Sequence, residues 1–336
     1  MINLVQLDHY DSQGMYKIYD EWPKLALEGY NQNQKFDGIK EINHIVFCGM
    51  GGSGTIGDMF YSIFSKTRIH VSVVKGYLLP NTVNERTLVI TTSISGNTIE
   101  TLTVLDTARK KGCKIIAVSS GGKMEEYCKK YNIDFRKIIQ NHSPRASFPR
   151  FLFSLIKILE NFLPLESNDV LNSITELEGM RKNISSSNLH DSNQSIKIAK
   201  WITGIPLIYF PWGLNAAAIR FKNSLQENSK IHVMSEDIIE ACHNGIVSWE
   251  NKSNVQPILI QGKDDYHKTI ERWSILKEYF HENKINYYEV YSIDGDILSK
   301  LINLIYLLDY ASIYFAVINK TDPSTIKSIE FIKNRL

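Results

Sequence analysis

The stretch Ile45-Val-Phe-Cys-Gly-Met-Gly-Gly-Ser-Gly54 decides the fold. Its apolar start predicts a buried strand, and the glycines after it predict a tight turn opening a helix. A strand, a turn and a helix in this order begin a βαβ unit, whose strands run parallel. Further short apolar runs succeed it, and we expect buried parallel strands also at Val71–Val74, Leu88–Thr92, Ile115–Ser119 and Phe135–Ile139.

A second series of the same kind comes after a polar segment, Arg181–Gln194, which we expect to be a loop. Its strands are expected at Leu207–Phe210, Ile231–Met234, Pro257–Ile260 and Tyr287–Tyr291. Helices are expected at Ile99–Lys111, Phe151–Leu163, Ala216–Leu225, Thr269–Glu282, Ile297–Val317 and Ser324–Arg335. The order predicts an α/β protein with two doubly wound parallel-sheet domains, residues 1–150 and 151–336, the second ending in two C-terminal helices.

Composition excludes several classes of function. The formal net charge of the 336 residues is only +2, whereas nucleic-acid-binding proteins usually carry a concentrated basic face. No apolar run approaches the ~18 residues that span a bilayer, and the N-terminus lacks a signal-peptide core. We therefore expect neither nucleic acid nor membrane as a partner. Four scattered cysteines without a CxxC pair indicate reduced thiols in a cytoplasmic protein: Cys48, Cys113, Cys128 and Cys242.

The glycine-rich turn allows three interpretations. Gly49, Gly51 and Gly54 match GxGxxG, but a dinucleotide site needs an acidic residue after the next strand, and that position holds Lys75. Lys75 leaves a phosphorylated dinucleotide open, and a tight turn without any ligand is equally open. A Walker-type loop is excluded because no lysine follows Gly54. The third interpretation, an anion site, is favoured by the residues of the neighbouring turns.

Hydroxyl groups gather at the turns that end the predicted strands. Ser53 sits at a helix start beside the backbone N–H groups of Gly51 and Gly52. After the third strand, Ser93, Ser95 and Thr98 supply three hydroxyls, more than one helix cap requires. A further turn, Ser119-Ser-Gly-Gly-Lys123, ends the next strand. Because ligands bind outside the carboxyl ends of parallel strands, these turns predict a cradle for a phosphate monoester.

Three polar residues are candidates for chemistry. Glu227 ends a predicted helix in Gln226-Glu-Asn-Ser-Lys230, His243 lies in Cys242-His-Asn-Gly-Ile-Val-Ser-Trp249, and Arg145 follows the fifth strand in Ser143-Pro-Arg-Ala. Each could equally be a solvated surface residue when taken alone. A carboxylate and an imidazole are nevertheless the usual proton-transfer groups, and a guanidinium stabilises developing negative charge.

The chain resembles the bifunctional phosphoglucose/phosphomannose isomerases of the SIS (sugar isomerase) superfamily over nearly its whole length. The resemblance rests on GMGGSGTIGD, TTSISGNTIETL, SSGGK, SPRA, LQENSK, CHNGIVSWE and the tail DYASIYFAV…DPS…FIKNRL, in the family's order. It implies two SIS-type domains and interconversion of glucose 6-phosphate, and mannose 6-phosphate, with fructose 6-phosphate through a cis-enediolate. It implies no cofactor and no metal.

The resemblance also implies roles for individual residues. Glu227 matches the family's base, His243 a ring-opening histidine donated across a homodimer, and Arg145 the arginine that stabilises the enediolate. Lys333 is the candidate for a C-terminal lysine at the site. The phosphate ligands match Ser53, Ser93, Ser95 and Thr98.

The sequence departs from the family's pattern in the histidine loop and near the tail. The usual HNEIVGW reads here with Gly245 in place of Glu and Ser248 in place of Gly, which puts the loop geometry in question. Ser324 and Thr325 both match a threonine that helps to admit mannose phosphate. Two rival functions stay open: a non-catalytic sugar-phosphate sensor, which needs neither Glu227 nor His243, and a dehydrogenase that uses the glycine turn.

Overall fold

The computed structural model describes residues 2–32, 36 and 42–335 and divides into two compact units. The N-terminal unit is Glu21–Thr175, and the C-terminal unit combines Met1–Asp20 with Glu176–Leu336. This division differs from the expected domains 1–150 and 151–336 at both ends. The first residues belong to the C-terminal unit because α1 (Leu4–Tyr10) and α2 (Met15–Asp20) pack on its long helix α13 (Ile297–Ile318).

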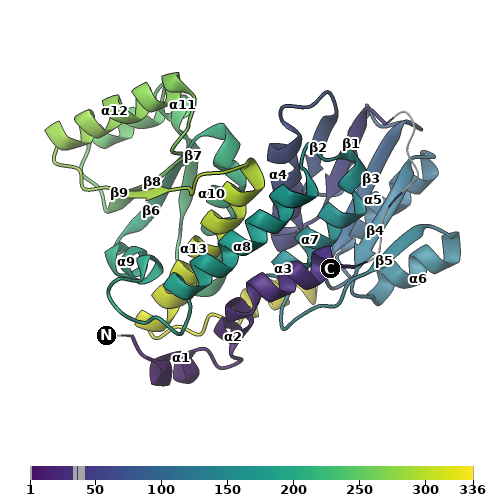
Figure 1. Ribbon diagram of the computed structural model, residues 1–336, viewed down its shortest axis with the longest axis horizontal. Helices are drawn as coiled ribbons and strands as arrows, with labels where there is room; N and C mark the ends of the chain where they lie inside the picture. Colours follow the sequence, from purple (N-terminus) through teal and green to yellow (C-terminus); the bar gives the residue numbers. More distant parts are fainter. Residues whose placement is uncertain (1, 33–35, 37–41, 336) are drawn as a thin grey trace. The chain divides into compact units, whose positions relative to one another are not determined.

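The N-terminal unit is built on a five-stranded parallel sheet in the order β2-β1-β3-β4-β5 (Figure 1). The strands are β1 (His44–Cys48), β2 (His70–Val74), β3 (Thr87–Ser93), β4 (Lys114–Ser119) and β5 (Asp134–Lys137). Each overlaps a strand expected from an apolar run. β1 and β3 are buried along their whole length, as expected of central strands covered on both faces.

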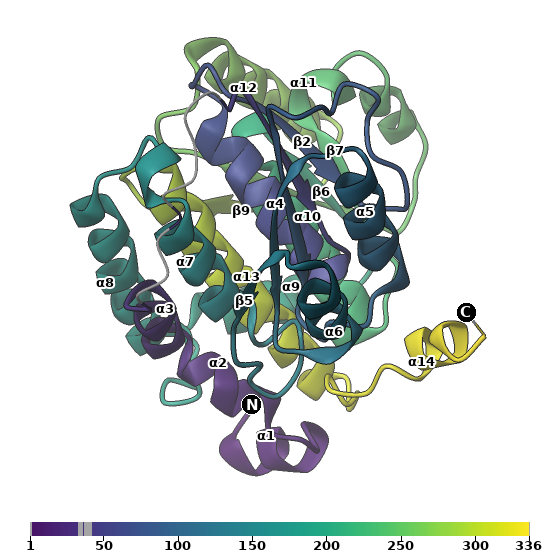
Figure 2. The same ribbon diagram turned by 90° about the vertical axis from the view of Figure 1, so that its right-hand side faces the viewer.

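Helices cover both faces of this sheet, with α4 (Gly51–Phe64) on one side and α5 (Ile99–Lys110) and α6 (Gly122–Tyr131) on the other (Figure 2). The remaining helices are α3 (Trp22–Tyr30), α7 (Phe148–Ile158), the short 3₁₀ turn η1 (Glu160–Phe162) and the first part of α8 (Ser167–Ile184). The expected helix over Phe151–Leu163 therefore starts earlier and ends in a 3₁₀ turn. This arrangement is the doubly wound fold.

The C-terminal unit contains a four-stranded parallel sheet in the order β7-β6-β8-β9. The strands are β6 (Ile205–Phe210), β7 (Met234–Asp237), β8 (Val255–Gln261) and β9 (Tyr288–Tyr291). The position expected for the second strand, Ile231–Met234, was wrong: β7 lies three residues later, because Leu207 of β6 pairs with Met234 and Phe210 with Asp237. β7 is an edge strand, and such a strand tolerates polar residues that a search for apolar runs passes over.

The helices of the C-terminal unit frame this sheet. Besides α13 they are α9 (Gln194–Trp201), α10 (Asn215–Ser229), α11 (Ile238–Ala241), α12 (His267–Glu282) and α14 (Lys327–Lys333), with 3₁₀ turns η2 (Trp212–Leu214) and η3 (Gly245–Glu250). The loop expected over Arg181–Gln194 is shorter, since α8 continues to Ile184 and Asn193 caps α9. Helix α14 is shorter than the expected Ser324–Arg335 helix.

Helix α13 is the core of the C-terminal unit. It is long and apolar enough to cross a membrane by length and composition, contrary to the expectation that no such segment exists. However, 94% of its most apolar window is buried inside the protein, as in the central helix of a globular domain. The sequence does not show this helix as one apolar run because Lys300 and Asp309 interrupt the apolar residues.

A buried ion pair joins α10 to α13, which run side by side (Figure 1). Arg220 Nη2 lies 2.7 Å from Asp309 Oδ2, and the two side chains are 3% and 0% exposed. Asp309 also accepts hydrogen bonds from Ser224 Oγ at 2.6 Å and from Tyr19 Oη at 3.2 Å. Burial opposes the charge of Arg220, but the Asp309 carboxylate prevails and raises the guanidinium pKa.

We predict that Arg220→Met destabilises the C-terminal unit by about 3–5 kcal/mol, because Asp309 is left charged and buried. Urea unfolding followed by circular dichroism measures the loss. The double variant Arg220→Met/Asp309→Leu should recover much of it, since neither charge then remains. Lys268→Met, which breaks an exposed pair with Glu271, is the matched control and should cost less than about 1 kcal/mol. Equal midpoints for Arg220→Met and the control would contradict a stabilising role for the buried pair.

Candidate active site

The turns predicted to bind phosphate all lie at one edge of the N-terminal sheet. Because its strands are parallel, the turns after β1, β3 and β4 all leave from the carboxyl ends of neighbouring strands. Chain direction across the sheet reverses between β1 and β3, and this switch point is where doubly wound folds bind ligands. The helices α4, α5 and α6 begin at these turns, so three positive helix ends meet there.

The glycine-rich turn after β1 is tight for identifiable reasons. Gly51 opens α4 with φ +52°, a left-handed conformation that favours glycine. A Cβ on Gly49 would lie 2.8 Å from the backbone and side chain of Ser53, so only glycine fits there. The backbone N–H groups of Ser53 and Gly54 both bond to the Met50 carbonyl. Ser53 is 8% exposed in the first turn of α4.

The turn after β3 contains the three predicted hydroxyls in unequal positions. Ser93 is 1% exposed; its Oγ donates to Thr98 Oγ1 at 3.0 Å and accepts from the Gly96 N–H at 3.1 Å. Ser95 and Thr98 are half-buried, and Thr98 is the N-cap residue of α5. The Ser93 hydroxyl therefore shapes the turn, while those of Ser95 and Thr98 are the more accessible to a ligand.

The turn after β4 is locked to the turn after β3. The Ser120 N–H and Oγ both donate to the Ile94 carbonyl, and the Met124 N–H donates to the Gly96 carbonyl. Asn97, which sequence reasoning missed, accepts from the Lys123 N–H at 3.1 Å. Its position between a glycine and a hydroxyl residue is the only sequence signal for this role.

The lysine that left a phosphorylated dinucleotide open is already paired with a carboxylate of the protein. Lys75 Nζ lies 2.5 Å from Asp58 Oδ2, so its charge is committed to an ion pair. Burial raises the pKa of Asp58, and Lys75 opposes that rise.

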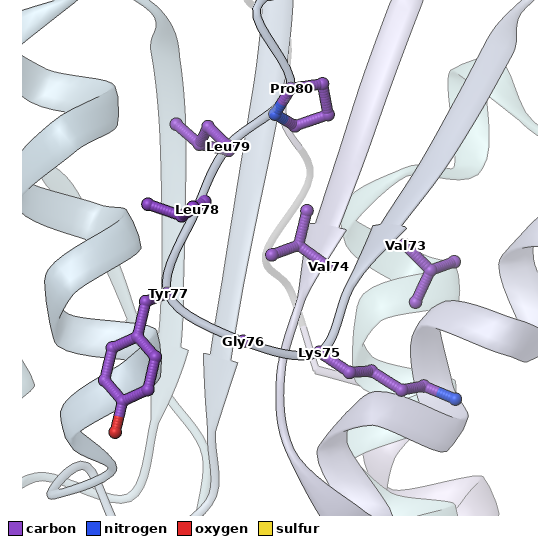
Figure 3. Close-up of a pocket in the computed structure, with 8 residues that line it drawn as sticks. All are labelled: Val73, Val74, Lys75, Gly76, Tyr77, Leu78, Leu79 and Pro80. Carbon is purple, nitrogen blue, oxygen red and sulfur yellow. The ribbon is translucent and has the colours of Figure 1, made fainter.

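An open pocket of about 710 Å³ is lined by Val73–Pro80, where the side chains of Lys75 and Tyr77 point in opposite directions (Figure 3). Within the residues that the structure describes, no group of three His, Cys, Asp or Glu side chains is placed to hold a metal.

Arg145 is a buried residue at the end of a partly exposed loop that leaves the carboxyl end of β5. The residue is 6% exposed. Ser147 anchors the loop: its Oγ accepts from the Asn141 N–H at 2.8 Å and contacts the carbonyls of Asn141 and Ser143. Asn141 and His142 were not singled out in the sequence, although a polar run directly after a strand is the signal that could have found them.

Glu227 lies half-buried in the last turn of α10, as predicted for a helix end. The two residues that follow it fix the backbone to α13: Asn228 Nδ2 donates to Ser312 Oγ at 2.8 Å and Ser229 Oγ donates to the Ser312 carbonyl at 2.7 Å. Lys230 then ends the helix with φ +57° and donates to the Glu227 carbonyl at 2.8 Å. The carboxylate of Glu227 is therefore carried on a rigid helix end.

His243 is exposed on the turn between α11 and η3. Gly245 lies against Glu236: a Cβ on Gly245 would be 2.5 Å from Glu236 Oε2, so a larger residue requires that carboxylate to move. Burial, with the charges of Glu240 and Asp237, raises the pKa of Glu236. The glycine at this position thus fits the local packing of this chain. Trp249 Nε1 donates to Tyr209 Oη at 2.9 Å and ties η3 to β6.

Glu227 and His243 lie toward opposite ends of the C-terminal sheet. Helix α10 returns from the carboxyl end of β6 to the amino end of the parallel strand β7, so Glu227 is near the amino edge. His243 follows α11, which begins at the carboxyl end of β7; Figure 1 shows α11 and α9 at opposite ends of this sheet. A four-residue strand is roughly 13 Å long. The path of the chain therefore places Glu227 and His243 toward opposite ends of β7.

The tail residues differ in their surroundings. Lys333 is exposed at the end of α14, a helix without a buried residue that Figure 2 shows apart from α13. Ser324 is 7% exposed and its Oγ donates to Asp11 Oδ1 at 2.8 Å. Thr325 is half-buried. Of the two candidate hydroxyls, that of Ser324 is thus committed to the interior.

Comparisons with known proteins cover nearly the whole chain. Residues 38–154 match the family described as "SIS domain", and residues 191–336 match "Bacterial phospho-glucose isomerase C-terminal SIS domain". A protein of Aquifex aeolicus named "Bifunctional phosphoglucose/phosphomannose isomerase" is 32% identical over 93% of this chain and 97% of its own length. A protein of the same name from Caldicellulosiruptor bescii is 30% identical over 88% of this chain and 90% of its own.

Two further similarities are more distant. "D-glucosamine-6-phosphate 4-epimerase" of Sulfolobus acidocaldarius is 28% identical over 73% of this chain and 77% of its own length. The solved C-terminal domain of glucosamine-fructose-6-phosphate aminotransferase from Francisella tularensis aligns with a TM-score of 0.67 at 18% identity, covering 92% of this chain and 97% of that one. This structural match supports the fold alone.

We predict that Gly96→Ala separates the turns after β3 and β4, because a Cβ there would lie 1.8 Å from the Gly121 carbonyl oxygen. Gly112→Ala is the matched control: Gly112 has φ +69°, close to the φ +72° of Gly96, but open space around its Cβ position. Gly96→Ala should lower the thermal midpoint more than the control and weaken the binding of inorganic phosphate, measured by calorimetry. Equal behaviour of the two variants would show that the close approach of the turns is unimportant.

Proposed function

The chain belongs to the family of bifunctional phosphoglucose/phosphomannose isomerases, and we propose that it interconverts glucose 6-phosphate, and as a second substrate mannose 6-phosphate, with fructose 6-phosphate. The observation that carries the proposal is the full-length similarity to enzymes of this name, at up to 32% identity. The hydroxyl-rich turns and the rigidly held Glu227 supply groups of the kind that the reaction needs.

The phosphate group of the substrate is assigned to the turns of the N-terminal unit. Backbone N–H groups of Gly51 and Gly52, with the hydroxyls of Ser53, Ser95 and Thr98, can donate hydrogen bonds to its oxygens. Ser93 takes part by exchanging its bond to Thr98 for one to phosphate, or by holding the turn in shape. Binding energy spent on phosphate positions the reacting carbons.

The proton transfer is assigned to Glu227. Once the sugar ring is open, the base removes the proton from C2 of the aldose, the electrons form a C1–C2 double bond, and O1 becomes an oxyanion. The hydroxyl proton on O2 then moves to O1, and return of the abstracted proton to C1 leaves the carbonyl at C2, which is fructose 6-phosphate. The guanidinium of Arg145 is assigned to the enediolate charge, since it stays protonated throughout. Lys333 is assigned an auxiliary positive charge.

A sugar-phosphate sensor on the same fold is the alternative, and two features weigh against it. Glu227 is held by buried hydrogen bonds of its neighbours, whereas a binding protein has no use for a fixed base. The relatives that match over the full length carry the names of enzymes. The related epimerase means that an assay must identify the product, not only the loss of substrate.

We propose a homodimer in which His243 serves the partner's site and assists ring opening. The opposite placement of Glu227 and His243 on one sheet supports this, because one chain alone does not join them. Exposed apolar residues flank the histidine: Ile239 is 38% exposed and Val247 is 57% exposed. Such residues gain from cover by another chain.

A cytoplasmic location is proposed on the cysteines. All four are free thiols, including the half-buried Cys113 and Cys242. Proteins with several cysteines usually form disulfides in oxidising compartments, whereas reduced thiols are typical of the cytoplasm.

We predict that the purified protein converts fructose 6-phosphate into glucose 6-phosphate and mannose 6-phosphate, with each aldose measured by its own coupled dehydrogenase assay. Activity should survive EDTA. Loss on chelation with recovery on adding a divalent metal would indicate a different isomerase class. Binding of the sugar phosphates without either product would favour the sensor.

We predict that Glu227→Gln lowers kcat by at least two orders of magnitude while sugar-phosphate binding is retained, because the amide preserves the shape and removes the base. Solvent hydrogen exchange at C2, followed by NMR, should disappear with turnover. Glu282→Gln, an exposed change in the same unit, is the control and should behave as wild type. Normal exchange in Glu227→Gln would exclude this residue as the base.

We predict complementation between Glu227→Gln and His243→Ala. His243→Ala must first be shown to have low activity with the cyclic form of the sugar phosphate. In a mixed dimer with shared sites, one site collects both lesions and the other none, so roughly a quarter of all sites recover after random exchange. If the histidine acts within its own chain, every site keeps a lesion, and the mixture stays inactive despite demonstrated subunit exchange.

A further inference from the structure

The loop Asn141-His142-Ser143, between β5 and Arg145, contains four buried polar atoms that have no hydrogen-bond partner among the residues that the structure describes. They are Asn141 Oδ1, both ring nitrogens of His142 and Ser143 Oγ. Each buried polar atom without a hydrogen-bond partner lowers the stability of the fold by about 1–3 kcal/mol. Several such atoms in one loop are therefore not expected in a segment with a purely structural role. The set indicates a partner other than the protein chain itself.

The loop is also built to hold its shape. His142 adopts φ +56°, a left-handed conformation that is uncommon for residues other than glycine. Hydrogen bonds on both sides maintain it: Gln140 Nε2 donates to the His142 carbonyl at 3.3 Å, and Ser147 Oγ fixes Asn141 and Ser143. A strained backbone held by its surroundings is typical of binding and catalytic loops.

The chemistry of these atoms indicates what they bind. A phosphate offers only acceptors at neutral pH and is matched by donors, as in the turns after β1 and β3. In this loop, Asn141 Oδ1 is an acceptor, a neutral His142 offers one donor and one acceptor, and Ser143 Oγ offers both. Such a mixture suits a neutral polyol, whose hydroxyls donate and accept in turn.

We propose that Asn141, His142 and Ser143 bind the sugar hydroxyls of the substrate, with His142 as the principal contact. The proposal rests on the proposed function. The loop leaves the same carboxyl edge of the sheet as the phosphate-binding turns and leads directly into Arg145. It adds a binding residue to the site and leaves the proton transfer to Glu227.

The test compares His142→Asn and Ser143→Ala with His281→Asn, an exposed histidine on α12. Asparagine tolerates the left-handed conformation, so His142→Asn keeps the backbone and shortens the reach. We expect KM for fructose 6-phosphate to rise roughly tenfold in His142→Asn and severalfold in Ser143→Ala, with kcat within about twofold, as for lost uniform binding. Inhibition by inorganic phosphate should be unchanged.

Stability separates binding from a structural role. Removal of an unsatisfied group should leave the thermal midpoint of the free protein unchanged or raised, whereas loss of a structural contact would lower it. Unchanged KM in both variants would overturn the proposal and leave buried water as the partner. A parallel loss of phosphate inhibition would also overturn it, by assigning the loop to the phosphate.

Failure of the proposed function is distinguishable from failure of this inference. A wild-type protein without turnover would refute the isomerase assignment. Calorimetric titration with glucose 6-phosphate and with inorganic phosphate would then still compare wild type with His142→Asn. A selective loss of affinity for the sugar phosphate supports the loop as a polyol site, and equal affinities refute it.

Discussion

The parallel direction of every strand is the constraint on which the candidate site depends. In the N-terminal sheet it brings the turns after β1, β3, β4 and β5 to a single edge. Three helices begin there, so backbone N–H groups and helix dipoles add to the serine and threonine hydroxyls. The glycines at 49, 51 and 96 then permit close approaches that a Cβ would prevent or strain. The edge proposed to bind phosphate thus results from topology and a few small residues.

The same constraint separates Glu227 from His243. Both positions result from the path β6–α10–β7–α11, in which a crossover helix must return to the amino ends of the strands. A histidine after β7 therefore emerges at the far end from a glutamate that ends α10. Only 16 residues apart in sequence, they cannot be joined by a local turn, because the strand between them is paired along Leu207–Phe210. The proposed sharing of His243 between two chains fits this geometry without any change of fold.

Much of this could be predicted from the sequence, and the rest fails for physical reasons. Short apolar runs identified buried strands such as β1 and β3, since such strands need apolar residues on both faces. Edge strand β7 was displaced to Met234–Asp237 because pairing with β6, not hydropathy, sets its register. Likewise, the hydroxyls at Ser93 and Ser95 were visible as residues, but the burial of Ser93 within its turn depends on Thr98 and Gly96. Asn141 and His142 were missed because a polar run after a strand is common, and the lack of hydrogen-bond partners that distinguishes this one is visible only in the structure.

The two sheets share a strand order but not a binding edge. The C-terminal switch point lies between β6 and β8, where the turn after β8 carries Lys263, Asp264 and Asp265 in place of hydroxyls. Asp265 accepts from the Gly262 N–H and from Trp273 Nε1, both at 3.1 Å, and burial raises its pKa. Lys300 pairs with Asp264. Carboxylates at this edge repel a phosphate, so the repeated architecture does not repeat the hydroxyl-rich turns proposed as a phosphate cradle. The proposed base, Glu227, lies instead at the opposite edge, where the anchored end of α10 supplies rigidity that a loop would lack.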